Sequence, residues 1–322
     1  MDDLRWFASN DFTALVVPEL RRSGLTVALD GTAPARITVA MSGRIAEDAW
    51  RYARALRTPL IVFIWDLPPQ GTAVGTPDPV WSLGGRLIRL PRIVGGYRRR
   101  AGYYSRLRYI ASRADAVWTP SGFTTALLEE RFGVSGVAVP YCYDSNRFTP
   151  GPGPRDVPPV LLTVSRLEAH KNQAAVLEAA ALLRGRVTVR LIGRGPEDAR
   201  LRRLGEKLGV AFRLETAADD NAVEMANRTA AVAVCPSRFE GFGLGPIEAL
   251  ASGTPVVASD IPPHREFVGN AARLVAPDDP AAIARAVEEA LESPAPNPSA
   301  VKDLTIPAAA ARILSRLSPM LR

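Results

Sequence analysis

The sequence contains few of the residues that bind metal ions or form disulfides. It has only two cysteines, Cys142 and Cys235, and only two histidines, His170 and His264. The cysteines form no Cys-x-x-Cys motif, so we expect two buried, reduced thiols. Two histidines argue against a His-based metal site, and the sequence has no Asp-x-Asp triplet that would bridge a diphosphate through a metal. We therefore expect no metal and no other cofactor.

Long apolar segments are also missing. The longest apolar run, LIVFIW, is far shorter than a membrane span and is typical of a buried strand. The first residues, MDDLRWFASN, are acidic and predict no secretory signal. We predict a cytoplasmic protein and leave open a peripheral contact with a membrane surface.

Lysine is scarce, although the chain is basic. Its net charge is +7, and of 40 basic residues only Lys171, Lys207 and Lys302 are lysines. The net charge permits an anionic partner without requiring one. A lysine at a suspected phosphate site is more informative in a chain that otherwise uses arginine.

The pattern of apolar runs predicts an α/β fold in two domains. Continuous apolar strands alternate with helical patterns in both halves, which is typical of doubly wound parallel sheets of the Rossmann-like kind. Proline and glycine accumulate in FTPGPGPRDVPP, so we predict a linker there. The predicted boundaries are residues 1–150 for the first domain, 151–159 for the linker, 160–305 for the second domain, and 306–322 for a terminal helix that can pack back on the first domain.

The segment CPSRFEGFGLGPIEALASGTPVVASD joins two apolar strands through a glycine-rich loop. Glycine lets the backbone approach a ligand, and backbone N–H groups that lead into a helix favour an anion. We expect the helix to begin at Gly245 or Pro246, with Glu248 in its first turn. Glu240 and Glu248 can then accept hydrogen bonds from sugar hydroxyl groups. The alternative is structural, because a glutamate at a helix start is stabilised without any ligand.

This segment resembles the signature of retaining GT-B glycosyltransferases of family four, in which two glutamates are separated by seven residues. The resemblance implies two Rossmann-like domains that face each other across a cleft and bind a nucleoside-diphosphate sugar. It implies that Glu240 contacts the transferred sugar and Glu248 the ribose. The sugar and diphosphate would also meet the backbone of four loop residues, namely Gly241, Phe242, Gly243 and Leu244.

Other segments of the second half match the same family. TVSRLEAHKN places Arg166 and Lys171 where the family binds the diphosphate, although Ser165 replaces the usual glycine. Gly193 and Gly195 match a short motif beside the nucleotide, which by itself also fits a tight turn. Leu214 and Glu215 occupy the place where the family contacts the base. For His264 and Glu266, in PPHREFVG, we expect a surface role.

The first half departs from the family and is shorter. SNDFTALV replaces the usual glycine-rich loop, so Asn10 and Asp11 are candidates for the acceptor side. Trp65 stands where a histidine is common, followed by Asp66. Trp65 can stack on an acceptor ring or simply be a packed aromatic residue. The motifs leave the sugar, the base, the acceptor, the linkage and the oligomeric state open.

A basic segment runs from Arg86 to Arg113 without an acidic residue. Its arginines and tyrosines fit an anionic lipid surface, a nucleic acid or an anionic acceptor, and they equally fit a solvated face. As a whole, the sequence predicts a retaining, metal-independent, hexosyltransferase-like enzyme. The alternatives are a GT-B sugar-nucleotide epimerase and a non-catalytic GT-B partner subunit that binds a nucleotide sugar.

Overall fold

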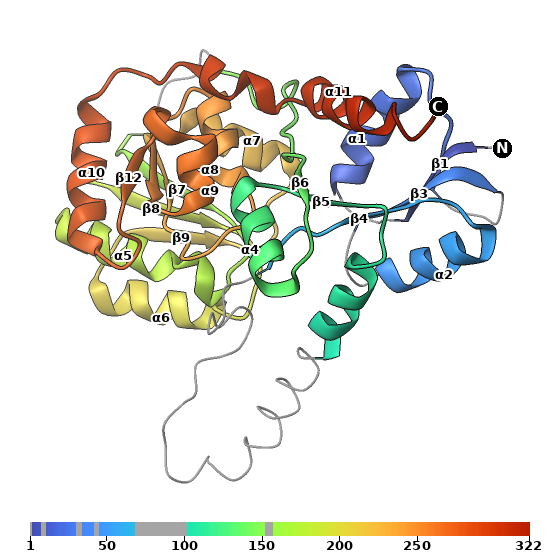
Figure 1. The fold of residues 1–322 in the computed structure, drawn as a ribbon. Helices are drawn as coiled ribbons and strands as arrows, with labels where there is room; N and C mark the ends of the chain where they lie inside the picture. Colours follow the sequence, from blue (N-terminus) through green and yellow to red (C-terminus); the bar gives the residue numbers. More distant parts are fainter. Residues whose placement is uncertain (1, 8–10, 30–33, 42–44, 68–101, 152–156) are drawn as a thin grey trace, which may run out of the picture. The chain divides into compact units, whose positions relative to one another are not determined.

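The computed structural model describes residues 2–7, 11–29, 34–41, 45–67, 102–151 and 157–322 (Figure 1). Contacts divide these residues into two units. Unit 1 holds the described residues up to Pro140 together with Pro307–Arg322, and unit 2 holds Tyr141–Ile306. Within the described residues, no helix is both long and apolar enough to cross a membrane.

Unit 1 is built on a six-stranded sheet in the order β2-β1-β3-β4-β5-β6, and every pair in it is parallel. The strands are β1 (Asp2–Phe7), β2 (Val27–Ala28), β3 (Ala35–Ala40), β4 (Leu60–Phe63), β5 (Ala116–Thr119) and β6 (Val137–Ala138). The helices are α1 (Asp11–Arg22), α2 (Ala46–Leu56), a helix over 102–111, α4 (Gly122–Phe132) and α11 (Ile306–Leu317). The apolar run LIVF forms β4, and all four of its residues are buried.

Local signals in the sequence set the ends of α4. The Ser121 side chain accepts a hydrogen bond from the backbone N–H of Thr124, at 3.1 Å, and Gly133 ends the helix in the left-handed conformation. Serine at the N-cap and glycine after the last turn satisfy backbone groups that the helix leaves unpaired.

Unit 2 contains a second six-stranded parallel sheet, in the order β12-β11-β10-β7-β8-β9. Its strands are β7 (Val160–Val164), β8 (Thr188–Ile192), β9 (Phe212–Glu215), β10 (Val232–Cys235), β11 (Val256–Ser259) and β12 (Arg273–Val275). Its α-helices are α5 (Gln173–Leu182), α6 (Asp198–Leu208), α7 (Asp220–Thr229), α8 (Leu244–Ala251), α9 (Pro262–Phe267) and α10 (Pro280–Glu292). Short 3-10 helices cover Ala169–Lys171, Gly269–Ala271 and Pro298–Leu304.

The strand order of unit 2 reverses between β7 and β10. The chain runs outward from β7 through β8 to β9, and then returns to pair β10 with the other side of β7. In doubly wound sheets this switch point opens a crevice at the carboxyl ends of the strands, where ligands bind. The loops that follow β7 and β10 are therefore the candidate ligand-binding region of unit 2.

The predicted start of one helix is wrong in detail. The helix α8 begins at Leu244, so Pro246 is its third residue and Glu248 lies in its second turn. Proline is tolerated there because the first four N–H groups of a helix have no intrahelical partner. The segment with His264 and Glu266 forms helix α9, in which proline occupies the first position.

Candidate functional site

A buried ion pair lies at the switch point of unit 2. Nζ of Lys171 is 2.6 Å from Oε1 of Glu240, and the two side chains are only 15% and 14% exposed. Lys171 ends the 3-10 helix after β7, and Glu240 lies in the glycine-rich loop after β10. Since β7 and β10 are parallel neighbours, their carboxyl ends bring these two loops together. The structure thus unites two residues that the sequence assigned to one donor site.

Charge compensation keeps Glu240 ionised inside the protein. Burial by itself would raise the pKa of this carboxyl group, but the Lys171 ammonium group and hydrogen bonds from Lys171 and Ser237 bring its pKa below the ordinary value. Glu240 is therefore a carboxylate at neutral pH. A carboxylate can accept hydrogen bonds from sugar hydroxyl groups.

Arg166 lies on the same loop but points to a different partner. It pairs with Glu168 at 2.7 Å and is 68% exposed. Glu168 also contacts Nδ1 of the buried His170, at 3.3 Å. Burial, followed by the charge of Lys171, lowers the pKa of His170, so this ring is neutral at pH 7. Arg166 is thus an accessible guanidinium group on the loop that also carries Lys171.

Gly193 and Gly195 follow β8 and support the loop that carries Arg166. A Cβ atom on Gly193 would lie 1.8 Å from the carbonyl oxygen of Ser165, and one on Gly195 would lie 2.2 Å from that of Leu167. The backbones are also hydrogen bonded, from Ser165 N to Ile192 O and from Leu167 N to Arg194 O. These glycines therefore have a structural reason to be present, namely the close packing of two loops.

The glycine-rich loop after β10 enters α8 through Gly243. Gly243 is the N-cap residue and has φ +95°, a conformation that residues with a side chain rarely adopt. Gly241 and Leu244 are partly exposed, whereas Phe242 is buried against Tyr141 and Phe267. The side chain of Phe242 therefore anchors the loop, while contact between the loop backbone and a ligand stays a prediction.

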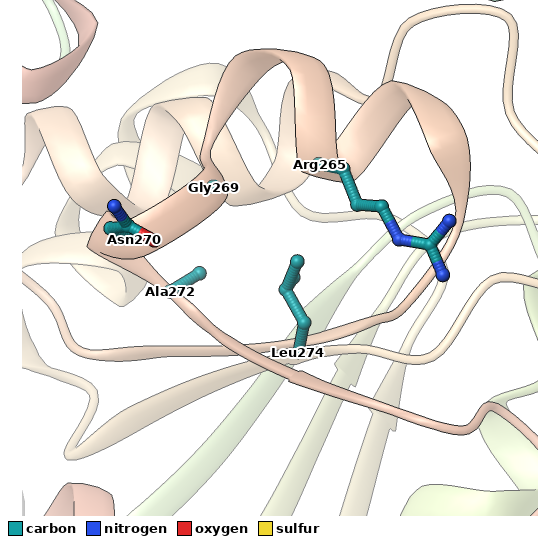
Figure 2. Close-up of a pocket in the computed structure, with 5 residues that line it drawn as sticks. All are labelled: Arg265, Gly269, Asn270, Ala272 and Leu274. Atoms are coloured by element: carbon teal, nitrogen blue, oxygen red, sulfur yellow. The ribbon is translucent and has the colours of Figure 1, made fainter.

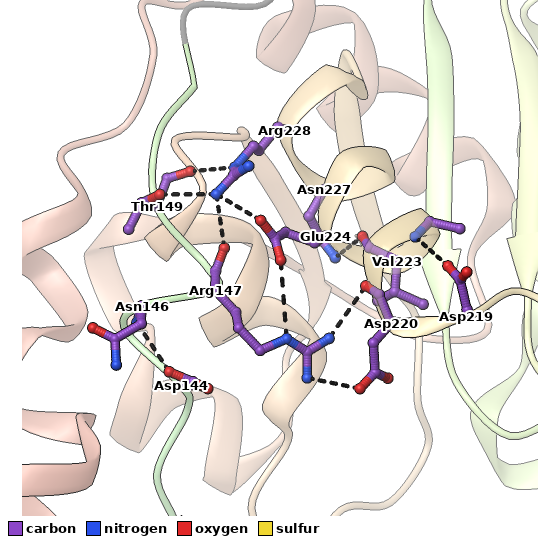
Figure 3. Close-up of polar contacts among 11 residues, drawn as sticks. Asp144, Asn146, Arg147, Thr149, Asp219, Asp220, Val223, Glu224, Asn227 and Arg228 are labelled. Carbon is purple, nitrogen blue, oxygen red and sulfur yellow. Dashed lines mark hydrogen bonds and ion pairs between the residues drawn. The ribbon is translucent and has the colours of Figure 1, made fainter.

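Glu248 lies one turn further along α8, in an unusual electrostatic setting. Burial raises its pKa to about 8, while the charge of Arg147 opposes the rise and that of Asp220 adds to it. Arg147 is held in place by α7, since it contacts Asp220 and Glu224 (Figure 3). Glu248 is therefore mostly protonated at neutral pH in the free protein, unlike Glu240.

The chain segment that carries Arg147 and Thr149 is held in place by a second arginine, Arg228. Arg228 donates to the carbonyl groups of Arg147 and Thr149, at 3.0 Å each, and to the Thr149 hydroxyl group (Figure 3). It also pairs with Glu224 at 2.8 Å. The segment that enters unit 2 is thereby fastened to α7, and Arg147 is fixed where its charge acts on Glu248.

Leu214 and Glu215 end strand β9. The Leu214 side chain is buried in the core, and its carbonyl group accepts a hydrogen bond from Arg202 at 3.2 Å. Glu215 pairs with Arg190 at 2.8 Å and with Arg213 at 2.6 Å, and the hydrogen bond from Arg190 is the main reason that its pKa is lowered. Their contact with a nucleotide base stays a prediction.

Of the acceptor-side candidates in unit 1, Asn10 and the side chain of Asp11 lie outside the described residues. Asp66 is exposed. Trp65 stacks on Phe63 with ring centroids 4.0 Å apart, meets Phe12 edge-on, and donates its indole N–H to the Met41 carbonyl group. Trp65 is thus packed into unit 1, and of its two sequence interpretations these contacts favour the packed aromatic one. Most of the basic segment, residues 86–101, also lies outside the described residues.

Sequence reasoning missed His264, because we expected it on the surface. It is only 1% exposed and its ring packs beneath the glycine-rich loop, where a Cβ atom on Gly243 would approach Nε2 to 2.9 Å. The Pro262-Pro263 pair after an apolar strand predicts a helix start, but no local signal predicts that the His264 side chain is buried. Cys235, at the end of β10, is half-buried, and burial raises the pKa of its thiol to about 12.

A pocket of about 480 Å³ lies where α9 leads through a 3-10 helix into β12. Its lining residues are Arg265, Gly269, Asn270, Ala272 and Leu274 (Figure 2). Arg265 is already paired with Asp260, and none of the residues of the Lys171–Glu240 site contributes to this pocket. Within the part of the chain that the structure describes, no group of three or more His, Cys, Asp or Glu side chains could hold a metal ion.

Comparison with known proteins agrees with this geometry. Residues 145–304 match the family model described as glycosyl transferases group 1. D-inositol 3-phosphate glycosyltransferase 2 from Catenulispora acidiphila is 37% identical over 176 residues, which are 47% of this chain and 41% of the relative. Phosphatidyl-myo-inositol mannosyltransferase from Mycolicibacterium smegmatis is 34% identical over 173 residues, which are 51% of this chain and 45% of the relative. The aligned regions thus span less than half the length of both relatives.

Among solved structures, HepE of Anabaena in complex with UDP and glucose is similar with a TM-score of 0.76. The likeness covers 99% of this chain and all of that one, at 15% identity, and it therefore concerns the fold. The fold is α/β with two doubly wound parallel sheets, as in GT-B glycosyltransferases. The family match and the relatives support a GT-B glycosyltransferase, and they do not favour the epimerase or the non-catalytic subunit.

Proposed function

We propose that this chain is a retaining glycosyltransferase that moves a hexose from a nucleoside-diphosphate sugar to an acceptor hydroxyl group. The observation that carries the proposal is the buried Lys171–Glu240 pair at the switch point of unit 2, with Glu248 eight residues after Glu240 on the adjoining helix. A carboxylate for the sugar, an amine for the diphosphate and a second carboxyl group for the ribose then lie in one loop region.

Lys171 and Arg166 are the proposed diphosphate ligands. In the free protein Lys171 is neutralised by Glu240, while Arg166 is two-thirds exposed. A diphosphate develops negative charge as it leaves, and fixed cations lower the energy of that transition state most when the site is closed to water. Together with the backbone N–H groups of Gly241, Phe242, Gly243 and Leu244, the two cations can supply this charge. For this reason, and because the sequence lacks an Asp-x-Asp triplet, we propose that the reaction is independent of a metal.

The proposed reaction exchanges one bond for another at the anomeric carbon. The bond from that carbon to the diphosphate oxygen breaks, and its electron pair stays with the diphosphate. The acceptor oxygen forms the new bond on the same face, and its proton passes to the leaving diphosphate. This front-face course, without a protein nucleophile, is what the family resemblance implies. Glu240 would orient the sugar through its hydroxyl groups.

An anionic acceptor or surface is the proposed partner on the side of unit 1. The names of two relatives refer to acceptors that carry phosphate, D-inositol 3-phosphate and phosphatidyl-myo-inositol. In this chain, arginines 106, 108 and 113 are exposed in the described part of the basic segment. A phosphorylated acceptor, free or lipid-linked, therefore fits this chain better than a nucleic acid. A cytoplasmic location, with a peripheral membrane contact, belongs to the same proposal.

Ligand-dependent stabilisation tests the function directly. The protein is heated with UDP, GDP and ADP and with their common hexose derivatives, since a ligand that binds only the native state raises the melting temperature. We expect one nucleotide series to stabilise the protein, and the matching nucleotide sugar to be hydrolysed slowly without acceptor. NMR of the released sugar, before mutarotation, should show the anomeric configuration of the donor. Stabilisation by none of the nucleotides, or inversion at the anomeric carbon, would contradict the proposal.

A further inference from the structure

In the described part of the chain, the imidazole ring of His264 has one nitrogen paired and one without a partner. His264 follows β11 at the start of α9, and its Nδ1 lies 2.9 Å from the carbonyl oxygen of Ser259. Nε2 is buried and has no hydrogen-bond partner among the residues that the structure describes. Because a buried polar atom without a partner costs free energy, such an atom calls for an explanation.

The surroundings decide which nitrogen carries the proton. A carbonyl oxygen can only accept, so Nδ1 must be the donor in its contact with Ser259 O. The Ser259 hydroxyl group, 3.2 Å from Nδ1, lies close to the Ser237 carbonyl group and donates there. Burial lowers the pKa of His264, so the ring is neutral. Nε2 therefore bears a lone pair and can only accept a hydrogen bond.

This lone pair lies at the donor site. A Cβ atom on Gly243 would be 2.9 Å from Nε2 of His264 and 3.8 Å from Cγ of Glu240. Gly243 thus lies between the imidazole edge and Glu240, and a side chain at this position would press on Nε2. A small shift of this glycine-rich loop would expose Nε2 to whatever Glu240 binds.

We propose that His264 is a donor-sugar-binding residue, whose Nε2 accepts a hydrogen bond from a hydroxyl group of the transferred sugar beside Glu240. This inference rests on the proposed function and adds a specificity-determining residue to it. The fixed ring orientation means that Nε2 selects a hydroxyl group at one position of the sugar. The nucleoside diphosphate itself makes no contact with His264.

The test compares two variants, each of which places an amide group near one of the two ring nitrogens. His264→Asn places an amide near Nδ1 and preserves the bond to Ser259 O, while His264→Gln places an amide near Nε2. Calorimetry gives the dissociation constants of the nucleoside diphosphate and of its nucleotide sugar. The constant of the diphosphate divided by that of the nucleotide sugar isolates the contribution of the sugar to binding. We expect His264→Asn to reduce this ratio about fivefold to tenfold with unchanged binding of the diphosphate, and His264→Gln to restore most of it.

A purely structural role would give a different result. Equal weakening of both ligands in His264→Asn, or an unchanged ratio, overturns the inference but leaves the proposed function standing. If the wild-type protein binds neither nucleotides nor their sugars, the proposed function falls and the inference with it.

A second measurement needs no variant that could fail to fold. The chain has only two histidines, so ¹⁵N-histidine NMR of the wild type contains few imidazole signals. The His264 Nε2 signal should shift upfield when the nucleotide sugar is added and stay in place with the nucleoside diphosphate alone. A ¹⁵N chemical shift of Nε2 that does not change when the nucleotide sugar is added, or that changes equally with both ligands, overturns the inference.

Discussion

Lys171 Nζ and Glu240 Oε1 lie 2.6 Å apart and join two loops that are 69 residues apart in the sequence. The pair is 15% and 14% exposed, so each charge depends on the other for compensation. In the free protein this contact holds the glycine-rich loop against the loop after β7. A bound diphosphate would take over part of the charge of Lys171, so we expect donor binding and loop position to be coupled at this pair.

Removal of one partner should therefore be more harmful than removal of both. Lys171→Met leaves the Glu240 carboxylate buried without its cation, and we expect a loss of about 2 to 4 kcal/mol in the free energy of unfolding. The double variant Lys171→Met/Glu240→Gln should regain part of that loss. Urea unfolding of the wild type, the two single variants and the double variant measures this double-mutant cycle. The exposed Arg186–Glu288 pair, at 65% and 42% exposure, supplies the control, since Arg186→Gln should cost under about 1 kcal/mol. Strict additivity of the two site variants would contradict the coupling.

Glu248 should make stability depend on pH between about 4.5 and 8. Its pKa is raised from 4.5 to about 8, so the folded state holds a proton that the unfolded state has released. The resulting stabilisation is complete below pH 4.5 and is lost as the pH rises through 8. Glu248→Gln keeps the shape without the charge and should stabilise the protein at pH 8 by about 1 to 3 kcal/mol. Melting temperatures at several pH values check this, and Glu206→Gln, on the exposed face of α6, is the control. A wild-type and a Glu248→Gln curve of equal slope would refute the assignment.

The sequence was sufficient for the parts of the molecule that depend on local pattern. Continuous apolar runs such as LIVF and VLLTV predicted buried parallel strands, and both formed as β4 and β7. The Ser121 cap of α4 was equally local. The loop motif with Glu240 and Glu248 could be found because its spacing is a property of consecutive residues.

The remaining features depend on contacts between distant segments. No local pattern shows that a Cβ atom on Gly193 would meet the carbonyl group of Ser165, or that Arg147 acts on Glu248. The burial of His264 likewise follows from the loop that covers it, not from its neighbours in the sequence. The start of α8 was misplaced because we expected the helix to begin at Gly245 or Pro246, whereas helices also accept proline in the later positions of the first turn.

Gly193 offers a direct test of the close packing between the loops after β7 and β8. Gly193→Ala would place a Cβ atom 1.8 Å from the Ser165 carbonyl oxygen, so backbone must move. We expect a loss of about 2 to 4 kcal/mol in the free energy of unfolding, and weaker nucleotide binding because the Arg166 loop shifts. Gly209→Ala is the matched control, since Gly209 also has positive φ but no atom of the described residues lies within 4 Å of the added atom. It should cost about 1 kcal/mol without any change in nucleotide binding. Equal effects of the two substitutions would rule out loop contact as the cause.

Replacement of Glu240 and of Glu248 with alanine should change the kinetic constants in different ways. Glu248 is proposed to bind the ribose in both ground and transition states, so Glu248→Ala should raise KM for the donor with little change in kcat. Glu240 is proposed to face the reacting sugar, so Glu240→Ala should lower kcat as well. Steady-state kinetics with the donor found by the ligand screen measure the difference. Wild-type kinetics in both variants would show that the site has been assigned incorrectly.

We expect the basic segment to determine which kind of anionic partner the chain binds. Arg98, Arg99 and Arg100 lie outside the described residues, but the helix over 102–111 continues their pattern with exposed Arg106 and Arg108. Near its end, the Arg113 guanidinium group lies 3.7 Å from the centre of the Tyr109 ring, and Tyr109 is 46% exposed. Stacked arginines of this kind keep their charge available to a surface while the aromatic ring orients them.

Replacement of Arg98, Arg99 and Arg100 with Gln should weaken binding to anionic vesicles about a hundredfold, because each arginine contributes about 1 kcal/mol near such a surface. Co-sedimentation over a salt series measures this loss, beside a gel shift with single- and double-stranded DNA. The control replaces Arg200, Arg202 and Arg203, which are exposed on α6, and so removes the same charge from unit 2. Only the first triple variant should lose vesicle binding. A DNA affinity that falls more steeply with salt than vesicle binding would point to nucleic acid instead. Full binding and transfer activity in both triple variants would show that the segment is a solvated face.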